Sequence, residues 1–141
     1  MSRPGREPKT GDPIRHRLEN GLLLLVLPRR HLPTFTATLI VPAGTAVEPE
    51  TLPGAAFFCS QMLPLGTRKR PAKRLADEVE GLGGALGSGC DYDYSSVEVS
   101  GLSKNTGPFL DILADVALRP AFEREEIERR RVQILGLLER R

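Results

Sequence analysis

Tryptophan is absent from this chain of 141 residues, and five phenylalanines and two tyrosines are its only aromatic residues. Charge of one sign is also lacking, because 20 Lys and Arg face 18 Asp and Glu, for a formal net charge of +2. Proteins that bind nucleic acids or membrane surfaces without specificity carry a marked excess of basic residues. Those that bind single-stranded nucleic acids also use aromatic side chains on which the bases stack. We therefore expect neither nucleic acid nor a membrane as a partner.

Cysteine and long apolar runs are equally scarce. Cys59 and Cys90 are the two cysteines, and no CxxC pair occurs, which excludes a disulfide framework and a zinc-finger pattern. The longest unbroken apolar run, residues 22–27, is far too short to span a membrane, and residues 1–6 contain no apolar signal core. The sequence thus predicts a cytoplasmic location by default.

The first part of the chain is predicted to be an arm followed by three strands. Residues 1–13 are rich in proline, glycine and charge without periodicity, which is typical of a disordered arm. The pair Asn20 and Gly21 separates two short segments, 14–18 and 22–27, and is a strong hairpin signal. Residues 34–41 begin by alternating threonine with apolar residues, the period of a half-buried strand.

The remainder is predicted to form two helices, a second hairpin and two further helices. Residues 55–65 and 71–82 carry the first two helices, residues 85–90 and 94–100 the hairpin, and residues 108–118 and 123–141 the last pair. The order βββ-αα-ββ-αα favours an α+β fold, with an antiparallel or mixed sheet covered by helices on one face. Residues 14–141 are expected to be a single domain and an incomplete one, because the last helix has no glycine or proline stop.

Several short motifs occur in a familiar order and spacing from about residue 14 to the end of the chain. They are Leu18-Glu19-Asn20-Gly21-Leu22, residues 43–49 (AGTAVEP), Gly54-Ala55-Ala56, Met62-Leu63, Gly66-Thr67, Leu82-Gly83-Gly84 and Pro120-Ala121-Phe122. Together they resemble the N-terminal domain of the insulinase (pitrilysin) zinc metallopeptidases, the family that includes mitochondrial processing peptidase.

The resemblance also implies that the metal site is lost. Active members carry an inverted zinc motif, H-x-x-E-H, in which two imidazoles one helical turn apart bind zinc and the glutamate activates a water. The matching positions here are Phe57, Ser60 and Gln61, while Leu137 and Arg130 stand where a ligand glutamate and a supporting glutamate would fall. The resemblance therefore implies a non-catalytic member without a metal, zinc being expected in active members only. We expect Phe57 and Phe58 to fill the vacated site as core residues, with Leu137 adding hydrocarbon.

In this family the strand after the Gly-Gly pair is an edge that takes up extended peptide. Ala85, Leu86, Gly87 and Ser88 match that strand and could bind peptide through the backbone without zinc. An ordinary structural strand is an equal alternative, since glycine weakens strands. The partner implied is an active peptidase subunit of the same family, or the remaining domains of the same protein.

Two other functions stay open. A hydrolase could survive through an unconventional metal site or through Cys59, provided that His16, His31 or carboxylates converge on it. Alternatively, the basic segment 68–74, with Arg68, Lys69, Arg70, Lys73 and Arg74, could bind an anionic partner. A solvated loop and helix start is the simpler explanation of that segment, because Asp77, Glu78 and Glu80 follow at once.

Overall fold

The structure, a computed structural model, describes residues 13–139. They form two compact units, one ending at Pro33 and the other beginning at Thr34. Residues 1–12, for which the sequence predicts a disordered arm, lie outside the described residues. Between residues 13 and 139, no helix combines the length and the apolar character needed to cross a membrane.

The first unit is the predicted hairpin. Strands β1 (Ile14–Arg17) and β2 (Leu23–Val26) pair antiparallel, with Ile14 opposite Val26 and Arg17 opposite Leu23. Gly21 turns the chain with a φ of 87°, a conformation that glycine adopts without strain. The Asn20 side chain accepts a hydrogen bond from the amide of Leu22 at 3.1 Å, so both residues of the Asn-Gly signal contribute to the turn.

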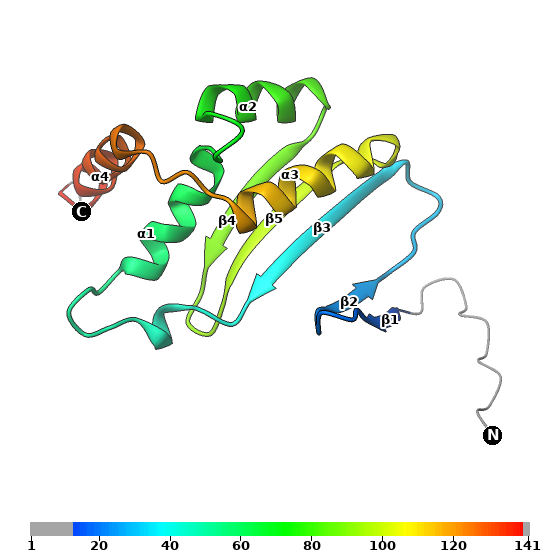
Figure 1. The fold of residues 1–141 in the computed structure, drawn as a ribbon, viewed down its shortest axis with the longest axis horizontal. Coiled ribbons are helices and arrows are strands. Elements are labelled where there is room, and N and C mark those ends of the chain that lie inside the picture. Colours follow the sequence, from blue (N-terminus) through cyan, green and yellow to red (C-terminus); the bar gives the residue numbers. More distant parts are fainter. Residues whose placement is uncertain (1–12, 140–141) are drawn as a thin grey trace. The chain divides into compact units, whose positions relative to one another are not determined.

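The second unit is built on a three-stranded antiparallel sheet (Figure 1). Strands β3 (Thr34–Val41), β4 (Ala85–Cys90) and β5 (Ser95–Leu102) lie in the order β3-β5-β4, so β3 and β4 form its edges. The predicted alternation is confirmed: Thr34, Thr36 and Thr38 are exposed on one face, while the apolar residues between them are half-buried on the other.

Four helices accompany this sheet in the predicted order. They are α1 (Ala55–Met62), α2 (Ala72–Gly81), α3 (Thr106–Leu118) and α4 (Arg124–Leu138), with short 3-10 turns at Thr45–Val47, Leu63–Leu65 and Ser103–Asn105. Figure 1 shows α3 lying along the sheet, α1 beside β4, and α4 farther out against α1. Pro71, expected as the first helical residue of α2, is instead its N-cap, a difference of one residue.

The core lies between β5 and helices α2 and α3. Its fully or nearly buried members come from those three elements: Leu75, Val79, Val97, Val99, Phe109, Ile112 and Val116. The Phe109 ring lies so close to Gly84 and Gly101 that a Cβ atom at either position would collide with it. The Gly-Gly motif before β4 therefore lets α3 approach the sheet closely.

Candidate functional site

Helix α1 carries Phe57, Ser60 and Gln61, the three positions that the family resemblance assigns to the zinc motif. Ser60 is buried, with 1% of its surface exposed, and its hydroxyl donates a hydrogen bond to the carbonyl oxygen of Phe57 at 2.7 Å. Gln61 is half-buried, whereas Phe57 is 45% exposed. A serine hydroxyl held by its own helix in this way is neither a general base nor an activated nucleophile.

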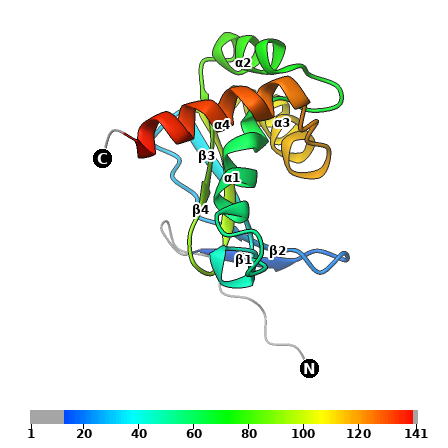
Figure 2. The same ribbon diagram turned by 90° about the vertical axis from the view of Figure 1, so that its left-hand side faces the viewer.

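Helix α4 carries the other two positions and contacts α1 (Figure 2). Arg130 is half-buried, and its Nε atom is buried without a hydrogen-bond partner among the described residues. Leu137 is 66% exposed. The expectation that Phe57, Phe58 and Leu137 fill the vacated metal site is therefore wrong for Phe57 and Leu137, whose side chains are largely exposed, while Phe58 is half-buried.

These side chains do not fit a zinc ion. Phenylalanine and leucine have no lone pair, glutamine is a weak neutral ligand, and arginine brings a positive charge. Within residues 13–139, moreover, no group of three or more His, Cys, Asp or Glu side chains is arranged to hold a metal. No catalytic step through a metal can be derived from this arrangement.

Cys59, the alternative nucleophile, is exposed on α1. His16 lies in β1 and His31 follows β2, both in the first compact unit, whereas α1 belongs to the second. Convergence of either histidine on Cys59 stays a prediction.

Strand β4 holds the four residues expected to bind peptide. Ala85 and Gly87 are exposed, while Leu86 packs against the core and Ser88 donates a hydrogen bond to the carbonyl oxygen of Ser60 at 2.6 Å. One side of β4 pairs with β5, and the other is an edge of the described sheet. The side chains thus anchor the strand to α1 while the outer backbone edge is left for pairing.

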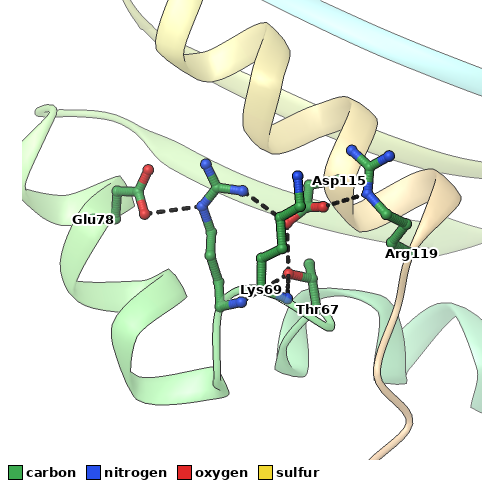
Figure 3. A network of polar contacts seen from close by, with 6 residues as sticks. Thr67, Lys69, Glu78, Asp115 and Arg119 are labelled. Carbon is green, nitrogen blue, oxygen red and sulfur yellow. Dashed lines mark hydrogen bonds and ion pairs between the residues drawn. The ribbon is translucent and has the colours of Figure 1, made fainter.

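A buried polar network that was not among the predictions from the sequence joins the loop before α2 to α3 (Figure 3). Asp115, of which 1% is exposed, accepts hydrogen bonds from Thr67 Oγ1 at 2.6 Å, Arg70 Nη1 at 2.7 Å and Arg119 Nε at 2.8 Å. Arg70 also donates from Nε to Glu78 at 2.9 Å. The basic segment 68–74 is therefore partly a structural element.

The network fixes the ionisation of Asp115. Burial alone would raise the pKa of this carboxyl, but the hydrogen bonds from Thr67, Arg119 and Arg70 outweigh it and hold the pKa at about 2. The signal for this group was present in the sequence, because Asp115 interrupts the apolar stripe of Phe109, Ile112 and Val116 on α3. A lone carboxylate in such a stripe predicts buried cationic partners.

Comparisons with known proteins agree on one group of relatives. Residues 26–139 match the family model described as Insulinase (Peptidase family M16). A probable mitochondrial-processing peptidase subunit beta of Arabidopsis thaliana is 30% identical over 118 residues, which cover 84% of this chain and 22% of that protein. Cytochrome b-c1 complex subunit 1 of Bos taurus is 30% identical over 122 residues, which cover 86% of this chain and 25% of that protein. The chain thus spans about a quarter of the length of these relatives.

Solved structures give the same answer for the fold. The peptidase M16 inactive domain from Pseudomonas fluorescens superposes with a TM-score of 0.84 at 28% identity, covering 91% of this chain and 31% of that one. Pitrilysin superposes with a TM-score of 0.80 at 23% identity, covering 94% of this chain and 14% of that one.

Proposed function

Because this chain belongs to the insulinase family, peptidase family M16, we propose that it is a non-catalytic member that pairs with an active peptidase and helps to hold extended peptide. The observation that carries this proposal is the replacement of every expected metal ligand on α1 and α4, at Phe57, Gln61 and Leu137, and of the general base, at Ser60. In this scheme peptide-bond hydrolysis takes place in the partner.

Two relatives support a non-catalytic role. One similar structure is described as an inactive domain, and one relative is a subunit of the cytochrome b-c1 complex. Arg130 adds to this, because a guanidinium in place of a supporting carboxylate repels a divalent cation.

The peptide-holding part of the proposal rests on β4. An edge strand binds extended peptide through backbone hydrogen bonds, and this requires no catalytic residue. Ser88 and Leu86 fasten β4 to the helices from one face. The strand is thereby held in a fixed position, which lowers the entropy cost of adding a peptide strand.

Zinc analysis tests the loss of the metal site. The purified chain should hold less than about a tenth of an equivalent of zinc. A genuine zinc site binds its metal tightly, so a content this low indicates that the chain has no such site. A rebuilt variant restores the expected residues with Phe57→His, Ser60→Glu, Gln61→His, Leu137→Glu and Arg130→Glu. It should bind about one equivalent of zinc if these five positions correspond to those of the zinc site in active members.

The matched control is the same variant with Leu138→Glu in place of Leu137→Glu, which moves the last ligand by one residue on α4. Circular dichroism establishes that both variants keep their helices. One tightly bound equivalent of zinc in the unmodified chain would refute the non-catalytic assignment. Equal zinc binding by the two folded variants would refute the assignment of Leu137 to the ligand position.

Peptide holding is tested with pairs of terminally blocked eight-residue peptides, unmodified and N-methylated at alternate residues. N-methylation removes backbone donors and leaves the side chains unchanged, so only the unmodified peptides should protect β4 amides from hydrogen exchange. Equal protection by both members of each pair would exclude strand addition.

Pairing is tested by co-expression with a homologue from the same source that carries an intact H-x-x-E-H motif. A stable complex, with sister activity that depends on this chain, is the expected result. A sister that is fully active and never binds the chain would refute the pairing.

A further inference from the structure

A polar pocket of about 430 Å³ lies between α2, α3 and the loop that joins α1 to α2. It is lined by four cationic residues, three carboxylates and one alanine: Lys69, Arg70, Arg74, Arg119, Glu78, Asp111, Asp115 and Ala114. Four positive and three negative charges leave the lining with a net charge of +1. None of these residues belongs to the expected metal site or to β4.

Two of the arginines that line this pocket, Arg70 and Arg119, share one buried carboxylate. Asp115 is buried and engages Arg70 through Nη1 and Arg119 through Nε. A guanidinium carries five N–H donors, so each arginine keeps donors beyond those that the network uses. The ion pairs to Asp115, at 2.7 Å from Arg70 Nη1 and 2.8 Å from Arg119 Nε, orient both guanidinium groups before any ligand arrives.

Two further cations line the pocket without taking part in this network. Lys69 and Arg74 make no ion pair within the part of the chain that the structure describes. Figure 3 draws Lys69 together with the network, and its side chain is exposed at the same pocket. Arg70 and Arg119 hold Asp115, whereas Lys69 and Arg74 are exposed and bring to the pocket charges that the network does not use.

We propose that this pocket receives the carboxylate side chain of an acidic segment of another protein. The guanidinium fork matches a planar carboxylate with two parallel hydrogen bonds. A single negative charge neutralises the net charge of the lining, whereas Glu78 and Asp111 oppose a more highly charged group such as phosphate. The volume admits the stem of an acidic side chain together with its carboxylate.

This inference rests on residues separate from those of the proposed function. Failure of the pocket to bind an acidic segment leaves the metal and peptide experiments unaffected. Success would identify the chemistry of one surface through which the chain meets another protein.

The test uses the full chain and three probes: terminally blocked hexaglutamate, blocked hexaglutamine and inorganic phosphate. Binding is followed by nuclear magnetic resonance in about 50 mM and about 300 mM salt, because screening weakens exposed charge pairs. Hexaglutamate should shift the amides of residues 67–74 and 111–119 saturably and more weakly at the higher salt concentration. Hexaglutamine should shift neither segment.

Two matched double variants locate the site. Lys69→Gln with Arg74→Gln should weaken hexaglutamate binding about three- to tenfold, since each exposed pair contributes modestly. Lys104→Gln with Arg131→Gln removes the same charge from exposed residues outside the pocket lining and should leave binding unchanged within about twofold. None of these four side chains forms a hydrogen bond or an ion pair with Asp115. Both double variants should therefore fold, and thermal unfolding checks this.

Three results would overturn the proposal: no saturable shift with hexaglutamate, equal weakening by the two double variants, or phosphate binding as tightly as hexaglutamate. The last would assign the pocket to small oxyanions in place of a protein segment.

Discussion

Replacing Asp115 with asparagine should destabilise the second unit in a way that depends on pH. The carboxyl has a pKa of about 2 in the folded chain against an ordinary value of 3.8, a difference of about 1.8. At about 1.36 kcal/mol for each pKa unit, ionised Asp115 contributes about 2 kcal/mol of stability near neutral pH.

The sign follows from proton binding. Above pH 5 neither the folded nor the unfolded chain protonates Asp115, so its contribution is fully present. As the pH falls from about 5 to about 2, the unfolded chain takes up the proton first, and the contribution is progressively lost. Asparagine cannot titrate, so the stability difference between wild type and variant should shrink over this interval.

At pH 6 or above the full cost of Asp115→Asn should be about 3 kcal/mol, because removing one partner of a buried ion pair leaves the others uncompensated. Removing one partner of a buried ion pair usually costs about 3–5 kcal/mol. The lower value applies here, because the Arg70 and Arg119 side chains are 19% and 44% exposed and can regain water. About 2 kcal/mol of this difference should disappear by pH 2.

The assay is urea unfolding followed by far-ultraviolet circular dichroism, because the chain contains no tryptophan. Asp111→Asn is the matched control: this exposed residue precedes Asp115 by one turn of α3 and should change stability by less than about 0.5 kcal/mol. A wild-type-to-variant difference that stays constant between about pH 6 and pH 2.5 would refute the reasoning.

Two further predictions concern packing around β4. Gly84→Ala should cost about 1–3 kcal/mol because its Cβ would collide with the Phe109 ring and a neighbouring backbone carbonyl, whereas Gly87→Ala, with nothing within 4 Å, should cost less than 1 kcal/mol. Equal urea midpoints for the two variants would show that the close approach of α3 is absent. Ser88→Ala should cost about 1 kcal/mol by removing the hydrogen bond to the Ser60 carbonyl, and faster hydrogen exchange in β4 should accompany it. Unchanged stability and exchange would contradict this anchoring.

The order of elements could be predicted because local signals were strong. The Asn20-Gly21 turn, the Thr34–Val41 alternation and the helix over residues 71–82 each depend on neighbouring residues, and the structure confirms all three. The family could be predicted from short motifs in order, as the match over residues 26–139 confirms. Motifs of this kind encode turns and close approaches that few residue types can satisfy.

Burial of individual side chains on α1 could not be predicted. Residues 55–58 are all apolar, so the sequence offers no polar face from which to orient the helix. Its orientation comes from contacts with β4 and α4, which lie far away in the sequence. For this reason Phe57 was expected in the core but is exposed, and Ser60 is buried instead.

The sequence by itself determined the order of strands and helices, the family, and the absence of metal ligands from the expected positions, because each depends on residue identity or local spacing. Only the tertiary structure decided that Thr67, Arg70 and Arg119 meet at Asp115, and that Lys69 and Arg74 line the same pocket as Arg70, Arg119 and Asp115. The physical reason is that a buried carboxylate selects partners by distance in space, and no local pattern records which distant cations the fold brings within reach.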